Sequence, residues 1–174
     1  MSPSKENVAF SSYGRPWMIV VRGRRGMAFD RWLVKRTGFS AVSLQYALAG
    51  QNPYQPTLLM TVRGAKSGEP REVALPYVRR GESYIVVASK GGGPVNPHWV
   101  ANAKANPQVW LHVGRKKISA VAHVAVGQER AELFPFVCAN KPNVARYQER
   151  ASTFGREIPL VVLTPEAHGK GTVK

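Results

Sequence analysis

The chain has 174 residues and a mass of 19.1 kDa, which suits one compact domain. Hydrophobic residues make up 44% of the sequence, enough to bury a core, so wholesale disorder is excluded. The 25 Lys and Arg residues outnumber the 10 Asp and Glu residues and give a formal net charge of +15. This charge indicates an anionic partner, which leaves nucleic acid, anionic lipid and a polyanionic cofactor as candidates.

Three features of the sequence bear on its compartment. The longest apolar stretches, such as residues 18–21 and 84–88, fall far short of the roughly 20 residues that a membrane-spanning helix needs. Cys138 is the single cysteine, which excludes an intrachain disulfide and a cysteine-based metal site. The N-terminus lacks the apolar segment of a secretory signal. We therefore expect a cytoplasmic protein.

The N-terminal third predicts two helices. Residues 1–14 are polar, and we expect them to be poorly ordered. Residues 29–36 predict a short basic amphipathic helix that ends at Gly38, and residues 41–49 predict a second helix. In the first helix, an apolar face of Phe29, Trp32 and Leu33 opposes a polar face of Asp30, Arg31, Lys35 and Arg36.

From residue 56 onward the pattern changes to that of strands, and residues 71–79 show it as an alternation of Val73, Leu75 and Tyr77 with their neighbours. Strands are expected at residues 57–63, 71–79, 83–89, 108–113, 117–126 and 158–163. Residues 97–105 predict a short helix, and residues 128–151 a longer one that breaks near Pro142. Six short strands with helices between them predict a small antiparallel barrel, closed or half-closed, with the helices packed outside.

Two glycine-containing loops are candidate binding sites. Residues 64–68, with Lys66, Ser67 and Arg71, combine exposed backbone N–H groups with a hydroxyl and two cations, which suits a phosphate or carboxylate. A plain solvated turn explains the same pattern. Residues 89–93 contain three consecutive glycines, which would let a ligand approach the backbone closely.

A third candidate lies at the start of the short helix. Trp99 and Asn102 fall near one face there, close to helix-terminal N–H groups that can meet an anion. A core Trp and a capping Asn explain these residues nearly as well. The four histidines lack metal-binding spacing, and Asp30, in the N-terminal helix, is the only Asp, which argues against a Ser/His/Asp triad. Neither a GxGxxG nor a GxxxxGK[ST] pattern occurs.

Together with Tyr147-Gln148 and residues 157–165, these three segments resemble the deazaflavin-dependent nitroreductase and quinone reductase family of mycobacteria and related actinobacteria. The resemblance covers about residues 56–165. It implies a mainly β fold with flanking helices, a split β-barrel of the FMN-binding type. We accordingly divide the chain into a basic helical region at residues 1–50, the barrel at 51–165 and a polar tail at 166–174.

The family implies the cofactor coenzyme F420, an 8-hydroxy-5-deazaflavin carrying a phospholactyl group and an oligoglutamate tail, and no metal. By resemblance, the phosphate and the tail carboxylates would be held by Lys66, Ser67 and Arg71. The ring and its side chain would be lined by Leu75, Pro76, Val87, Ala88, Ser89, Lys90 and Gly91, and the pocket would be completed by His98, Trp99 and Asn102. Ser89 and Tyr147 would polarise the acceptor, donate a proton to it or hold it in position.

Two positions depart from the family pattern. Ala65 stands where an Arg is frequent, so one tail contact is missing, and Val144 stands where several nitroimidazole-reducing relatives carry a Tyr. The implied activity is hydride transfer from carbon 5 of the reduced deazaflavin to a quinone, an activated alkene or a nitro-aromatic, and Val144 weighs most against the nitro-aromatic.

Two other functions stay open from the residues alone. One is a split barrel that binds FMN instead. The other is a non-enzymatic basic module on nucleic acid, suggested only by the charge. The sequence shows no strip of aromatic residues alternating with Lys and Arg on the strands, so we expect no nucleic-acid partner.

The N-terminal region also suggests a membrane contact. Residues 17–21 are apolar, and Arg22, Arg24 and Arg25 follow directly. Such a segment, together with the amphipathic helix, can lie on the inner face of the cell membrane with its cations at anionic headgroups. Packing of the same apolar residues on the barrel is the alternative.

Overall fold

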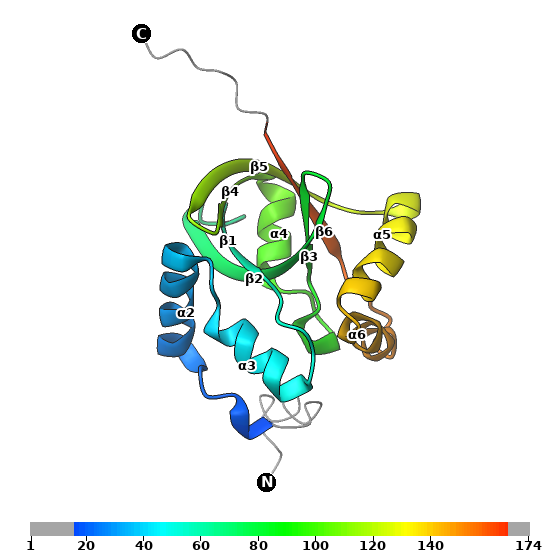
Figure 1. The fold of residues 1–174 in the computed structure, drawn as a ribbon. Coiled ribbons are helices and arrows are strands. Elements are labelled where there is room, and N and C mark those ends of the chain that lie inside the picture. The colour runs from blue at the N-terminus through cyan, green and yellow to red at the C-terminus, as the bar shows by residue number, and fades with distance from the viewer. Residues whose placement is uncertain (1–15, 167–174) are drawn as a thin grey trace.

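The computed structural model describes residues 16–166, in which six strands form a closed antiparallel barrel with helices around it (Figure 1). The predicted fold class is therefore confirmed. The strands follow one another around the barrel in the order β1-β2-β3-β6-β5-β4. They are β1 (Thr57–Arg63), β2 (Pro70–Arg80), β3 (Ser83–Val87), β4 (Gln108–Val113), β5 (Lys116–Val124) and β6 (Leu160–Pro165). The expectation of disorder in residues 1–14 lies outside the described residues.

Alternate side chains of each strand point into the barrel, and their burial fixes the register. In the β1–β2 pair, for example, Leu58 stands opposite Leu75, and both are buried. Helix α4 (His98–Ala105) adds Trp99, Val100 and Ala103 to the same core. The barrel interior is thus a packed apolar core, and a ligand has to bind outside it.

Helices α5 (Gly127–Asn140) and α6 (Asn143–Ser152) lie beside β3 and β6, with α6 below the barrel in Figure 1. They pack through a second core that includes Val137, Val144 and Ile85. Lys141 and Pro142 separate the two helices, as the predicted break near Pro142 requires. This break turns the chain and brings α6 to one end of the barrel.

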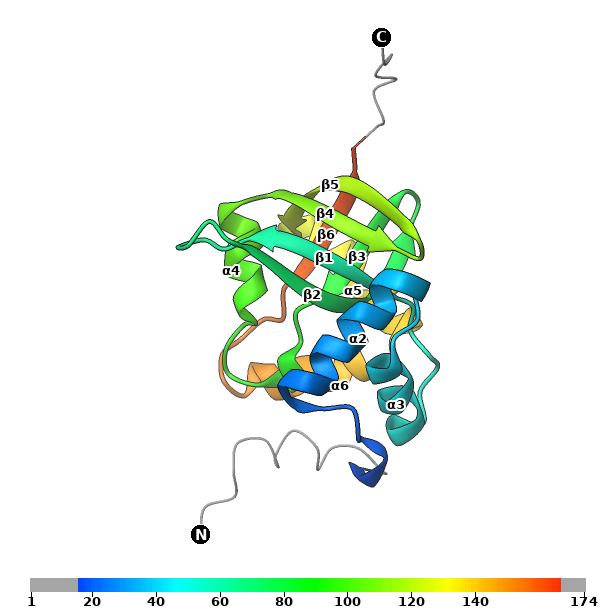
Figure 2. The same ribbon diagram turned by 90° about the vertical axis from the view of Figure 1, so that its left-hand side faces the viewer.

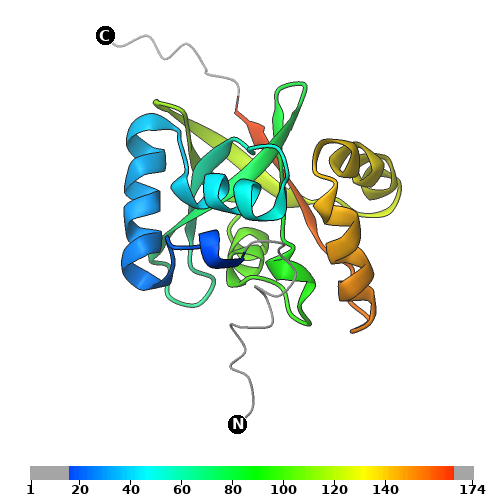
Figure 3. The ribbon, with the colours of Figure 1, turned by 60° about the horizontal axis from the view of Figure 1, so that its bottom comes forward.

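Helices α2 (Gly23–Thr37) and α3 (Ala41–Gly50) cover the other side of that end (Figures 2 and 3). Helix α2 stops at Gly38, as predicted, where φ is 76°. A Cβ at Gly38 would lie 2.6 Å from the Cα of Gly114 in the β4–β5 turn. Only glycine therefore permits both the left-handed conformation and the close approach of α2 to the barrel.

The predicted faces of the first helix are wrong. Asp30, placed on the solvated face, is buried, whereas Phe29 and Trp32 are 50% and 56% exposed. Asp30 is buried because its carboxylate binds polar groups where α2 meets the start of α3. It accepts hydrogen bonds from the hydroxyl of Ser40, the N-cap of α3, and from the backbone N–H of Val42 in its first turn. These bonds make burial of the charge tolerable, and they fix α3 against α2.

Candidate functional site

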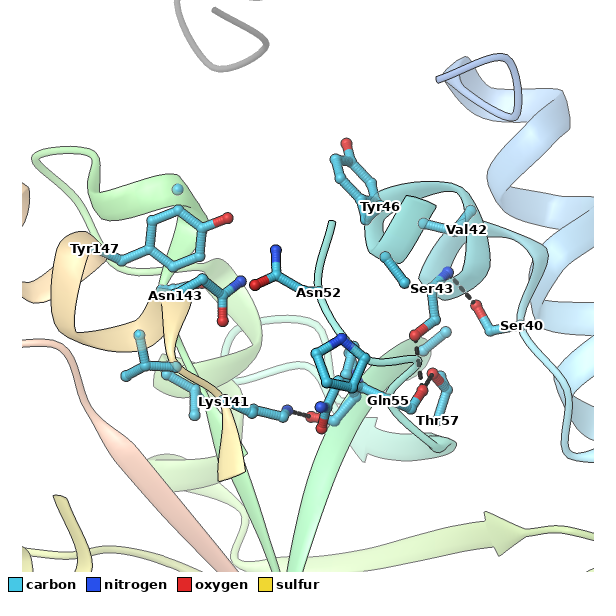
Figure 4. Close-up of a pocket in the computed structure, with 18 of the residues that line it drawn as sticks. Ser40, Val42, Ser43, Tyr46, Asn52, Gln55, Thr57, Lys141, Asn143 and Tyr147 are labelled. Carbon is cyan, nitrogen blue, oxygen red and sulfur yellow. Dashed lines mark hydrogen bonds between the residues drawn. The ribbon is translucent and has the colours of Figure 1, made fainter. Parts of the chain in front are cut away.

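A cleft of about 470 Å³ lies at the end of the barrel between α3 and α6 (Figure 4). This volume falls within the range of about 300–1,000 Å³ that is usual for small-molecule sites. One wall comes from the barrel strands and the loop after β3, a second from α2, α3 and the segment before β1, and a third from the start of α6.

The barrel wall contains five of the predicted site residues. The cleft is lined by Pro76 of β2, Val87 of β3, Ser89 of the loop after β3, and Lys90 and Gly91 of the short helix η2 (Lys90–Gly92). Side chains alternate along a strand, so the neighbouring Leu75 points instead into the barrel core. Ala88 likewise belongs to that core. Neither Leu75 nor Ala88 lines the cleft, so their contact with the cofactor stays a prediction.

The loop after β3 has an unusual backbone. Lys90, Gly91 and Gly92 all have positive φ, at 45°, 64° and 73°. A Cβ at Gly91 would meet nothing within 4 Å, so its backbone is open toward the cleft that it lines. A Cβ at Gly92 would come within 2.6 Å of the carbonyl oxygen of Tyr147, so this glycine serves the packing of η2 on α6.

Arg156 holds this loop in place. Its guanidinium donates to the backbone carbonyls of Ala88, Ser89 and Gly93 and to the side-chain oxygen of Asn96. The bonds to Gly93 and Asn96 measure 2.6 and 2.7 Å. Arg156 is only 8% exposed and clamps both ends of the strained segment. Arg156 is not among the predicted site residues, because no local pattern marks a guanidinium that binds carbonyls far away in the chain.

Helix α6 supplies Tyr147 and Val144 to the cleft, as Figure 4 shows for Tyr147. The structure thus brings the two predicted catalytic residues, Ser89 and Tyr147, to one cleft. Across from Tyr147 lies Tyr46 of α3, a residue that is not among the predicted site residues. Burial raises the pKa of the Tyr46 hydroxyl, so it stays neutral at ordinary pH.

A lysine that is absent from the predicted site residues lies at the base of the cleft. Lys141, between α5 and α6, is 6% exposed and donates from Nζ to the carbonyl oxygen of Pro76 at 2.8 Å (Figure 4). Burial lowers the pKa of Lys141 to about 7. The cleft therefore contains an amine that can gain or lose a proton near neutrality.

The α3 side of the cleft is polar and was also missed. Ser43 donates its hydroxyl hydrogen to the carbonyl oxygen of Gln55 at 2.7 Å, and Asn52 and Asn143 line the same cavity. These residues lie in α3, at the start of α6 and in the linker to β1. Their types are common in loops and helix ends, so only the fold reveals that they share a site.

The remaining predicted residues lie outside the cleft lining. Lys66, Ser67 and Arg71 are exposed on and beside the β1–β2 turn. The backbone N–H of Ala65 in this turn donates to the side-chain oxygen of Asn102 at 3.0 Å, which ties the turn to α4. On α4, His98 is exposed, whereas Trp99 is buried in the barrel core.

The cleft suits a flat, partly apolar ring with polar edges. Ala74, Pro76 and Val87 offer apolar surface on one side, and the open backbone of Gly91 allows close approach. The exposed cations of the β1–β2 turn suit an anionic chain. Within residues 16–166, no group of three or more His, Cys, Asp or Glu side chains could hold a metal ion, and no helix is long and apolar enough to cross a membrane.

Comparison with known proteins gives a consistent result. Residues 36–165 match the family described as F420H(2)-dependent quinone reductase. An F420H(2)-dependent quinone reductase of Mycobacterium tuberculosis (strain ATCC 25618 / H37Rv) is 36% identical over 147 residues, which cover 79% of this chain and 99% of the relative. The solved structure of an F420-H2 dependent reductase, FDR-A, superposes with a TM-score of 0.56 at 38% identity and covers 62% of this chain and 93% of that one.

Proposed function

Since the chain belongs to the F420H(2)-dependent quinone reductase family, we propose that it catalyses hydride transfer from reduced coenzyme F420 to a quinone in the cleft between α3 and α6. When bound, the reduced deazaflavin supplies the hydride, and the protein orients the two rings and excludes water. The observation that carries the proposal is the joint lining of one cleft by Ser89, Lys90, Gly91 and Tyr147.

The barrel wall is the proposed place of the deazaflavin ring. Pro76 and Val87 offer a flat apolar surface there, and the backbone of Gly91 is open beside it. The ring at this wall leaves the space toward Tyr46 and Asn52 for the acceptor. Ser89 and Tyr147 are then positioned to orient the acceptor from the wall and from α6.

A direct test mixes the purified protein with reduced F420 and menadione. We expect oxidation of the deazaflavin to be much faster than in the protein-free control, whereas no acceleration would contradict the proposal. Titration with FMN and with oxidised F420 in parallel separates the split-barrel alternatives, because tighter binding of FMN would argue against a deazaflavin enzyme.

Activated alkenes and nitro-aromatics are proposed as secondary acceptors. Both are electron-poor and accept a hydride as quinones do. Val144 lines the cleft and carries no hydroxyl that could donate to a nitro group. We therefore expect enones to be reduced faster than nitroimidazoles by the same enzyme, as an acceptor screen would measure.

We further propose that Lys66 and Arg71 bind the anionic tail of the cofactor. Both side chains are exposed, so each contact with a carboxylate contributes only about 0.2–1 kcal/mol. Lys66→Ala and Arg71→Ala are each expected to weaken F420 binding, and more so as the glutamate tail lengthens. Raised salt should reproduce the loss. Titrations at low ionic strength test this, with Arg115→Ala, in the β4–β5 turn, as the matched control; unchanged affinity in both variants would exclude the turn from binding.

Contact with an anionic membrane surface through the N-terminal region is also proposed. Helical spacing places Arg25, Phe29, Trp32 and Arg36 on one face of α2, and all four are exposed. The Phe29 and Trp32 rings stack with their centroids 6.0 Å apart, and Trp17 of η1 (Pro16–Met18) is 75% exposed. Exposed rings flanked by cations match the pattern of an interfacial helix. A quinone dissolved in the bilayer would then be close to the enzyme.

Vesicle co-sedimentation tests the membrane contact. We expect the protein to pellet with phosphatidylglycerol vesicles at low salt and to remain in solution with phosphatidylcholine vesicles. The double variant Trp17→Ala, Trp32→Ala should bind roughly tenfold more weakly, because two rings leave the interface. The exposed Trp110 of β4 provides the control, Trp110→Ala. Equal binding by all three proteins, or none by the wild type, would contradict the proposal.

A further inference from the structure

Lys141 is buried, which is unusual for a lysine. A lysine side chain is almost never fully buried unless it is paired with an acid. Lys141 is 6% exposed, and in the part of the chain that the structure describes it forms no ion pair with a carboxylate. Its amine donates to the carbonyl oxygen of Pro76 at 2.8 Å. The two other N–H groups of an ammonium remain available to a ligand in the cleft that the residue lines.

The cleft around Lys141 contains few competing charges. The other titratable side chains that line it are Asp30 of α2, Tyr46 of α3, Lys90 of η2 and Tyr147 of α6. Asp30 is already engaged with Ser40. Lys141 itself comes from the connection between α5 and α6 and reaches Pro76 within β2, where the proposed cofactor wall meets the acceptor space.

We propose that Lys141 is the general acid of the reaction, delivering a proton from Nζ to the oxygen of the reduced quinone. This role rests on the proposed function. A quinone that accepts a hydride gains two electrons and one proton and becomes a hydroquinone monoanion. One N–H bond of the Lys141 ammonium breaks, an O–H bond forms on the anionic oxygen, and the neutral amine regains a proton from water.

The chemistry of the cleft favours this residue over its neighbours. Burial of Lys141 lowers its pKa to about 7, so the ammonium is a good proton donor at neutral pH, whereas an ordinary lysine holds its proton too tightly. Burial has the opposite effect on Tyr46, whose pKa is raised. The serine hydroxyls of the cleft are much weaker acids than either. The positive charge of Lys141 also attracts the anionic oxygen before the proton moves.

The test compares Lys141→Met, Lys141→Gln and Lys141→Arg with the wild type and with Lys116→Met, an exposed lysine at the start of β5. Methionine is similar in size, glutamine keeps a donor for Pro76, and arginine keeps the charge without releasing a proton. With menadione and reduced F420, we expect kcat to fall about 100-fold in all three Lys141 variants. Lys116→Met should be unchanged. Affinity for oxidised F420 should stay within about twofold in the Lys141 variants, a readout that does not depend on turnover.

The pH profile gives the second measurement. The wild-type kcat should fall as the pH rises above about 7, because the donor loses its proton, and the profile of the Lys141 variants should be flat. In NMR spectra of protein labelled in its lysine side chains, without cofactor, one lysine should titrate near 7, and its signal should be absent from Lys141→Met.

The outcomes separate the two proposals. Recovery of kcat by Lys141→Arg would show that only the charge matters, and an unchanged rate and pH profile in Lys141→Met would show no role at all. Either result, or a lysine that titrates at its ordinary value, overturns the acid role while leaving quinone reduction intact. A wild-type protein that does not oxidise reduced F420 would overturn both.

Discussion

Replacing Arg156 by methionine is expected to lower the free energy of unfolding by about 2–4 kcal/mol and to remove most of the binding of F420. The guanidinium holds three backbone carbonyls and one amide oxygen in a single network, which is buried at Ala88 and part-buried at the other three bonds. Methionine fills much of the space but donates no hydrogen bond. A buried acceptor without a donor costs roughly 1–3 kcal/mol, and the loop relaxes to recover part of that cost.

The loss of binding follows from the backbone of the loop. Lys90 has a φ of 45°, a conformation that non-glycine residues rarely adopt unless their surroundings impose it. The Arg156 bonds to Ser89 and Gly93 bracket this residue. Without these bonds nothing holds the backbone of Lys90 at a positive φ, and the loop can relax to another conformation. We therefore expect F420 binding to fall more than the stability of the barrel.

Thermal melts with and without F420 measure both effects. The melting temperature should fall by roughly 5–15 °C in Arg156→Met, and added cofactor should no longer raise it. Arg156→Lys keeps the charge but not the planar fork, so we expect it to recover part of the stability and little of the binding. Arg146→Met, at an exposed position of α6, serves as the control. A ligand-induced shift of wild-type size in Arg156→Met would show that the clamp does not shape the site.

The strands of the barrel could be predicted because their signal is local. Residues 57–63 form a short, mainly apolar segment between turn residues, and β1 has those bounds. The ends of β3 and β6 are less well predicted. β3 stops at Val87 because the chain turns into η2, and β6 begins at Leu160 because Ile158 is used in packing against α6. Tertiary contacts that a single sequence does not display decide these boundaries.

The helix faces and much of the site could not be predicted for the same reason. Asp30 looked solvated because carboxylates usually are, yet it is buried with donors from the start of α3. The residues around Ser89 were found because consecutive glycines are a visible pattern. Arg156 and Lys141 were missed, because their partners lie 63 and 65 positions away at Gly93 and Pro76.

The buried amine of Lys141 is expected to make stability depend on pH in a specific direction. Its pKa is about 7 in the folded protein, lowered by burial from the ordinary 10.5 that applies to the unfolded chain. Between these two pH values Lys141 is protonated in the unfolded chain but neutral in the folded protein. The free energy of unfolding therefore rises with pH in this range. The slope is about 1.4 kcal/mol per pH unit for one proton.

Urea unfolding of the wild type and of Lys141→Met measures this slope. Other groups titrate in both proteins, so the useful quantity is the difference between their free energies of unfolding. At about pH 6 both states of the wild type hold the proton, and Lys141→Met should be the more stable protein because it buries no charge. The difference should shrink steadily toward about pH 9, as the folded wild type sheds its proton. Lys116→Met should follow the wild-type curve throughout. A constant difference between wild type and Lys141→Met would mean that the amine titrates alike in both states, and the ammonium would then hold its proton too tightly to act as the general acid.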